Sequence, residues 1–240
     1  FNECEFLERF GMAAKSGFNG VEYLFPYEFD KQNISDELLE NDLEQILFDL
    51  PAGDWGQGDR GVAVDPERKK EFEEGVAVAL EYADILNCSR LTCLAGMAPA
   101  GISDFEARST LTENLAFAAP LLGNEGITLL LEPINTIDIP GFWLNSTHEA
   151  ISVINEVKQA NLLLQYDIYH MQIMEGNLMN TIKDNIDVIG HFQLADNPGR
   201  NEPGTGEINY DYLLKSIDDL GYRDWIGCEY KPASDTLEGL

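Results

Sequence analysis

Short apolar segments alternate with longer amphipathic segments along the whole chain. The apolar segments are rich in Leu, Ile and aromatic residues and end at glycine, proline or an acidic residue, as buried strands do. They cover residues 20–26, 46–51, 90–96, 126–133, 162–170, 188–196 and 225–232. The pattern therefore predicts seven strands.

Between these strands, apolar residues recur with the period of an α-helix. The predicted helices cover residues 5–17, 36–45, 66–86, 105–122, 147–159, 178–184 and 210–221. Apolar strands that alternate with helices indicate a parallel sheet covered by helices, either doubly wound or closed as a barrel. We expect the barrel, because the first strand is not followed by the GxGxxG turn of a dinucleotide-binding sheet.

The alternation continues without a linker, so we expect a single (β/α)8 TIM-barrel domain over residues 1–240. A closed barrel of this type has eight strands. Because the chain begins with a helix and supplies seven strands, we expect the first strand to be missing from this sequence.

Charge and cysteine content narrow the choice of partners. The 240 residues carry a formal net charge of -28, which opposes attraction to nucleic acid or to anionic lipid. No apolar run is long enough to span a bilayer, so we expect no membrane partner. The four cysteines form no CxxC pair, which favours reduced thiols and a cytoplasmic location.

A polar residue that can bind a hard metal lies near the carboxyl end of each of the last four predicted strands. These residues are Glu132, Asp167, Gln193 and Glu229, and they follow one another at intervals of 35, 26 and 36 residues, about one strand-plus-helix unit each. In an α/β barrel the carboxyl ends of the strands surround one basin, so the four side chains are expected to converge. Gathered carboxylates repel one another unless a cation compensates them, and oxygen ligands suit Mg²⁺ or Mn²⁺. The sequence therefore predicts a divalent-metal site.

The three histidines do not form a zinc site with the cysteines, because no Cys/His cluster has ligand spacing. His148 is expected on a helix surface, and His191 in the barrel interior. His170 follows Asp167 by three residues, where it is expected to reach a substrate oxygen or donate a proton.

Several segments together resemble the hydroxypyruvate isomerase family, which lies in the xylose isomerase-like barrel superfamily. They are PAGDWGQGDRG (51–61), LLLEPINTIDIPGF (129–142), LLLQYDIYHMQIMEGNL (162–178), HFQLADNPGRNEPGTGEINYDYL (191–213) and WIGCEYKP (225–232). The resemblance covers nearly the whole chain. The sequence departs from the family pattern at Phe48 and Met97, where a relative is expected to carry His and Lys. These two departures bear on which substrate the protein accepts.

The resemblance implies that a cytoplasmic enzyme of glyoxylate metabolism interconverts hydroxypyruvate and 2-hydroxy-3-oxopropanoate (tartronate semialdehyde). It implies metal ligands at Glu132, Asp167, Gln193 and Glu229, and an acid/base pair at Glu132 and Glu229 that acts through a metal-stabilised enediolate. Which glutamate acts as the base in each direction is left open, as are the identity of the metal and the formation of a homo-oligomer.

A small 2-oxo acid substrate carries a carboxylate, which needs a cation or backbone donors in an acidic site. The nearest candidates along the sequence are Arg200, Lys231 and His170. Asp138 is a weaker candidate for a substrate contact, since it is equally suited to cap its loop.

Other functions stay open at this stage. A 2-oxo-tetronate (phosphate) isomerase or a ketose 3-epimerase of the same superfamily would use almost the same residues. A DNA-repair nuclease of this superfamily would need a basic face and several histidine ligands. A non-catalytic metal- or sugar-binding barrel would be expected to lack one of the two glutamates, and both are present.

Overall fold

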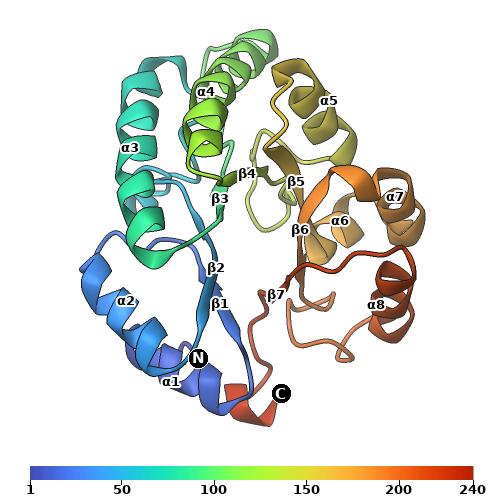
Figure 1. Cartoon of the computed structure of the whole chain (residues 1–240). Helices are drawn as coiled ribbons and strands as arrows, with labels where there is room; N and C mark the ends of the chain where they lie inside the picture. The colour runs from blue at the N-terminus through green and yellow to red at the C-terminus, as the bar shows by residue number, and fades with distance from the viewer. Residues whose placement is uncertain (240) are drawn as a thin grey trace.

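The computed structural model describes residues 1–239 and contains a parallel sheet whose seven strands follow the order of the chain. The strands are β1 (Gly20–Tyr23), β2 (Glu44–Asp49), β3 (Arg90–Cys93), β4 (Thr128–Leu131), β5 (Leu162–Asp167), β6 (Ile189–Leu194) and β7 (Ile226–Cys228). The sheet curls into a nearly closed α/β barrel (Figure 1). The predicted fold class and strand count are confirmed.

Helices lie around the outside of the strands (Figure 1). They are α1 (Glu8–Lys15), α2 (Lys31–Glu40), α3 (Lys69–Leu86), α4 (Asp104–Asn124), α5 (Thr147–Val157), α6 (Ile168–Met174), α7 (Leu178–Asn185) and α8 (Tyr210–Asp219). The main hydrophobic core lies between these helices and the strands. The residues of the predicted site lie at the carboxyl ends of the strands that these helices surround.

Two predicted segments differ from the structure. The helix expected over residues 36–45 is α2, and it lies five residues earlier because the Asp30 side chain accepts hydrogen bonds from the Gln32 and Asn33 N–H groups and so fixes its first turn. The strand expected over residues 162–170 ends at Asp167. There the aspartate side chain caps α6, a helix that the apolar sequence concealed.

The barrel interior is built in layers because alternate residues of a strand face the same side. On β5, Leu163, Gln165 and Asp167 follow one another toward the carboxyl end. Leu163 packs with Leu47 and Leu130 in a small apolar cluster. Apolar side chains thus fill the amino-terminal end of the barrel, and acidic side chains lie at the carboxyl end.

Between these two levels lies a hydrogen-bonded group that we call the interior network, made of Thr92, Gln165, Gln193, Glu22 and His191. The Thr92 hydroxyl donates to Gln165 Oε1 (2.6 Å), and Gln165 Nε2 donates to Gln193 Oε1 (2.6 Å). Gln193 Nε2 then donates to Glu22 Oε1 (2.8 Å), while His191 Nε2 lies 2.8 Å from Glu22 Oε2. The network joins four strands across the interior.

The ends of the described chain are close together. Figure 1 places both near α1, and the Thr236 hydroxyl donates to Glu3 Oε2 at 3.0 Å. Within residues 1–239, every helix is too short or too polar to cross a membrane. The single domain expected over residues 1–240 stays a prediction, and residue 240 lies outside the described part.

Candidate active site at the carboxyl ends of the strands

The acidic residues predicted at the strand ends lie on one edge of the sheet. Glu132 directly follows β4, Asp167 ends β5 and Glu229 directly follows β7. Gln193 lies beside Asp167 in the pairing of β5 with β6. We call Glu132, Asp167 and Glu229 the carboxylate site.

Ligand atoms of Glu132, Asp167 and His170 lie within 4.8 Å of one another, and all three residues are buried. Asp167 Oδ1 accepts the Tyr169 N–H at 2.7 Å and the His170 N–H at 3.4 Å, which starts α6 directly after the strand. This turn brings His170 back toward the strand ends. It also leaves Asp167 Oδ2 buried without a hydrogen-bond partner in the described chain.

Hydrogen bonding assigns the proton of His170. Its Nδ1 lies 2.6 Å from Asn135 Nδ2 and 3.4 Å from the Asn135 backbone N–H, which are both donors. Nδ1 is therefore the acceptor, and the neutral ring carries its proton on Nε2. Nε2 lies 3.5 Å from Asp167 Oδ2 and also 3.5 Å from Arg200 Nη2; the second is a contact between two donors in this tautomer and does not count as a hydrogen bond. Burial and the charge of Arg200 lower the pKa of His170 to about 3, so the ring is a neutral donor at physiological pH.

Arg200 reaches the carboxylate site from the loop after β6. Its Nη2 lies 2.8 Å from Glu229 Oε2 and 3.6 Å from Asp167 Oδ2, and its guanidinium lies 5.1 Å from the centre of the Tyr169 ring. Asp196 fixes this loop by accepting the N–H groups of Gly204, Gly206 and Ile208. Arg200 is thus a cation held among the acidic groups.

Two other predicted site residues are placed differently. Lys231 is exposed, and its contacts with this region run through its backbone: its N–H donates to the Arg200 carbonyl and its own carbonyl accepts from Asn201. The Gln193 carboxamide belongs to the interior network, where it bonds Gln165 and Glu22. Their predicted roles in binding substrate and metal stay predictions.

The carboxyl groups affect one another strongly. Burial raises the pKa of Glu132 well above its usual range, and the charges of Glu229, Asp167 and Asp49 add to the effect. Burial also raises the pKa of Asp167 and of Glu229, although the charge of Arg200 opposes the rise in both. Buried carboxyl groups whose pKa values are raised by one another are candidates for proton transfer.

These residues fit a divalent cation. Glu132 Oε1 and Asp167 Oδ2 are buried side-chain oxygens without hydrogen-bond partners in the described chain, and such atoms are costly unless a ligand satisfies them. Both are hard oxygen donors of the kind that Mg²⁺ and Mn²⁺ bind. The donor set and its charge therefore agree with the predicted metal.

Sequence analysis did not identify Asn135 or Asp49 as site residues, and it gave Asp138 only as a weaker candidate for a substrate contact. Asn135 orients His170, and Asp138 accepts hydrogen bonds from Asn135 Nδ2 (3.1 Å) and from the Tyr169 hydroxyl (2.9 Å). Asp49 ends β2 in the same way that Asp167 ends β5. The search for polar residues at the carboxyl ends of strands covered the last four strands only. Applied to the second strand, it would also have identified Asp49.

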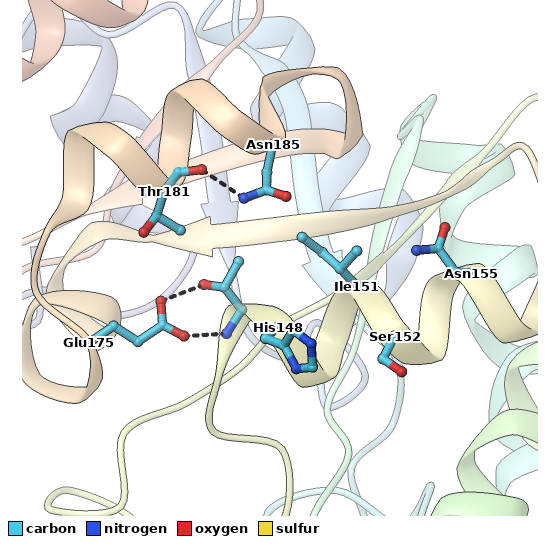
Figure 2. A pocket seen from close by; sticks show the side chains of 8 residues that line it. His148, Ile151, Ser152, Asn155, Glu175, Thr181 and Asn185 are labelled. Carbon is cyan, nitrogen blue, oxygen red and sulfur yellow. Dashed lines mark hydrogen bonds between the residues drawn. The ribbon is translucent and has the colours of Figure 1, made fainter.

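A polar groove lies away from these residues, between α5 and α7 (Figure 2). Its lining includes Thr147, His148 and Glu175. Glu175, which Figure 2 labels, accepts hydrogen bonds from the Thr147 N–H and hydroxyl, and these bonds fix the start of α5. This groove is built from helix-capping contacts, and the carboxylate site is the better candidate for catalysis.

Known proteins are similar to this chain in sequence and structure. The model of a family described as Xylose isomerase-like TIM barrel matches residues 10–240. Over its full length the chain is 53% identical to hydroxypyruvate isomerase of Escherichia coli strain K12 and covers 93% of it. It is likewise 45% identical to 2-oxo-tetronate isomerase of Cupriavidus necator, covering all of this chain and 92% of that protein.

Solved structures give the same fold. A crystal structure from Brucella melitensis, described as AP endonuclease, family 2, superposes with a TM-score of 0.97 at 43% identity, covering 100% of this chain and 92% of that one. D-Allulose 3-epimerase from Methylomonas sp. superposes with a TM-score of 0.80 at 23% identity, covering 95% and 79%.

Proposed function

The chain belongs to the xylose isomerase-like TIM-barrel family, and from that premise we propose that this isomerase interconverts hydroxypyruvate and 2-hydroxy-3-oxopropanoate. One observation carries the proposal. Glu132 and Glu229 face one site, and the charge of Glu229 contributes to the raised pKa of Glu132. A pair of proton-accepting groups on one site is what a transfer of hydrogen between adjacent carbons requires.

In this reaction, one glutamate takes a proton from the carbon that bears the hydroxyl group, and the other delivers a proton to the neighbouring carbon. The hydroxyl proton must move as well, from its oxygen to the former carbonyl oxygen, so that the hydroxyl becomes the new carbonyl group. The reaction is reversible, so either glutamate serves as the base according to direction. His170 donates a hydrogen bond from Nε2 to a substrate oxygen, and Asn135 holds the ring in that orientation. Arg200 is the cation nearest to the reacting groups and binds the substrate carboxylate.

We propose Mg²⁺ or Mn²⁺ as the cofactor. Glu132 and Asp167 would hold it with their unpartnered oxygens, together with Glu229 and the carboxamide oxygen of Gln193. Gln193 Oε1 has a second lone pair beside the one that Gln165 uses. A bound divalent ion supplies Lewis-acid stabilisation of negative charge on the substrate oxygens.

A second candidate function is the isomerisation of a 2-oxo-tetronate, which the 45% identity to the Cupriavidus necator enzyme favours. Its substrate is one carbon longer and would need the same proton transfer. A nuclease activity has less support, because a net charge of -28 repels a phosphate backbone. A homo-oligomer, a cytoplasmic location and a place in glyoxylate metabolism stay predictions.

The test is hydrogen exchange in D₂O followed by NMR, with the protein stripped of metal and then supplied with Mg²⁺ or Mn²⁺. We expect hydroxypyruvate to exchange its C3 hydrogens and to yield 2-hydroxy-3-oxopropanoate once metal is added. Turnover of the four-carbon acid with a much higher kcat/KM would select the second candidate. Absence of exchange with both acids would overturn the proposal.

A further inference from the structure

Tyr169 is a buried aromatic residue beside the carboxylate site to which the proposed reaction assigns no role. It is the second residue of α6 and is 5% exposed. The centre of its ring lies 5.1 Å from Arg200 Cζ and 5.4 Å from the centre of the His170 ring. Tyr169 is therefore a neighbour of both side chains that the proposed reaction uses to bind the substrate.

Both ends of Tyr169 are fixed by hydrogen bonds. Its N–H donates to Asp167 Oδ1 at 2.7 Å, and its hydroxyl donates to Asp138 Oδ2 at 2.9 Å. Asp138 is held in turn by Asn135, whose Oδ1 accepts the Asp138 N–H at 2.8 Å and whose Nδ2 donates to Asp138 Oδ2 at 3.1 Å. The segments that follow β4 and β5 thus hold the tyrosine ring in one orientation.

Arg200 combines a fixed backbone with a long side chain that has free donors. Its backbone φ is +57°, and its carbonyl accepts the Lys231 N–H at 2.7 Å. The guanidinium contacts Glu229 and Asp167 through Nη2. Within residues 1–239, its Nε and Nη1 have no hydrogen-bond or ionic partner, so these donors are available to a ligand.

The tyrosine ring stabilises the guanidinium without using these donors. A cation over the face of an aromatic ring is attracted to it, and the attraction is stronger where the two groups are shielded from water. Here the ring is buried, and the Arg200 side chain is 19% exposed. A carboxylate in the place of the ring would occupy N–H groups of the guanidinium, whereas the ring leaves them free for an incoming anion.

We propose, on the basis of the function proposed above, that Tyr169 is a positioning residue for substrate binding. Its ring, held by Asp138, keeps the Arg200 guanidinium beside the carboxylate site, so that the free N–H groups bind the carboxylate of the substrate. The role is indirect, because Tyr169 acts through Arg200. It favours substrates that carry a carboxylate over uncharged ones.

The proposal is tested with Tyr169→Met, which fills a similar volume and removes the aromatic ring. We expect KM for hydroxypyruvate to rise about 10-fold with a smaller change in kcat, since the lost attraction serves binding. The affinity of the Mg²⁺-supplied protein for pyruvate, measured by calorimetry, should weaken by a similar factor, whereas that for its uncharged amide should not. Tyr169→Phe, which keeps the ring, should retain most of the native affinity.

A double substitution separates this role from a merely structural one. In an Arg200→Met background, Tyr169→Met should have little further effect on the affinity for pyruvate, because a ring that acts through Arg200 then has nothing to hold. A structural role would instead give the same loss in both backgrounds. Tyr212→Met, which changes an exposed tyrosine on α8, is the matched control and should leave KM unaltered.

Thermal unfolding shows whether each variant folds, and Tyr169→Leu replaces Tyr169→Met if the latter does not. Unaltered KM and pyruvate affinity in the folded variant would overturn the proposal. An equal loss in the Arg200→Met background, or a loss in Tyr169→Phe as large as in Tyr169→Met, would also overturn it. Failure of the native protein to turn over either acid would instead count against the proposed function.

Discussion

The interior network and the carboxylate site lie one above the other in the same barrel, yet the buried polar groups of the two regions differ in their hydrogen bonding. In the network, the Thr92 hydroxyl, both carboxamides and Glu22 are paired, and only His191 Nδ1 lacks a partner among the described residues. In the site, Glu132 Oε1 and Asp167 Oδ2 are buried without a hydrogen-bond partner among the described residues, and Asp167 Oδ2 has only the longer ionic contact with Arg200 at 3.6 Å. Nearly all polar groups of the interior network are hydrogen-bonded, whereas the carboxylate site keeps oxygens that are not.

This difference in hydrogen bonding distinguishes a region that stabilises the fold from a region suited to bind a ligand. A satisfied buried network contributes to stability and fixes the positions of its members. An unsatisfied buried carboxylate lowers stability and persists where a ligand uses it. Removing a polar or charged group should therefore raise stability in the carboxylate site and lower it in the interior network.

The largest effect is expected for Glu132→Gln. Removing the acid/base group should lower kcat about 10³-fold, within the range that general acid/base catalysis supplies. The metal-free variant should at the same time unfold at a higher temperature, because an unpaired buried carboxyl group is replaced by a neutral amide. Steady-state kinetics and thermal unfolding measure the two effects. A kcat within tenfold of the native value would contradict the assigned role.

Gln165→Leu should have the opposite effect on stability. It removes the partner of the Thr92 hydroxyl and of Gln193 Oε1 and leaves both buried, which should lower the free energy of unfolding by about 2–5 kcal/mol. Denaturant unfolding measures the loss. Thr92→Val, which removes one end of the chain of bonds, should lose less and serves as the control. Equal stability of Gln165→Leu and the native protein would show that the network contributes nothing.

The smallest effect concerns pH. A carboxyl group whose pKa is raised by folding, such as Glu132, Asp167 or Glu229, stabilises the fold below its unfolded pKa of about 4.3 and loses this contribution as the pH rises through its folded pKa. His170 acts in the opposite sense, and its contribution is complete above about pH 6.5 and is lost as the pH falls toward 3. Above pH 6.5 the carboxyl groups therefore dominate.

Above about pH 6.5 the contribution of His170 no longer changes, so the Tm of the metal-free protein should fall as the pH rises through the raised pKa of Glu132, by about 2–4 °C for each kcal/mol lost. Added Mn²⁺ stabilises the ionised carboxylates and should abolish this decline. Glu132→Gln should show a shallower decline in the absence of metal. Identical slopes with and without Mn²⁺ would indicate that the ion does not bind these groups.

The sequence predicted most of the barrel because its strands are short and apolar and its helices long and periodic. It placed α2 five residues late, since a single capping side chain, Asp30, decides where that helix starts. It missed α6, because residues 168–170 continue the apolar run of β5 and only the Asp167 cap separates them.

Within the site, the spacing of strand ends found Glu132, Asp167 and Glu229, because one residue in each βα unit lies at the same level. The contacts of side chains were not predictable in this way. The binding of Gln193 to Gln165 and Glu22 depends on atoms from three strands, and no pattern within one strand encodes it. The same holds for the position of Arg200 between Glu229 and Asp167.

The buried Asp196 carboxylate also restricts the motion of the loop that carries Arg200. By accepting three backbone N–H groups from residues 204–208, it closes the loop that carries Arg200 into a ring. A ring fixed in this way opens rarely, whereas rotation of a side chain takes nanoseconds or less. The position of the guanidinium group at the carboxylate site is therefore expected to change by rotation of the Arg200 side chain, without opening of this loop.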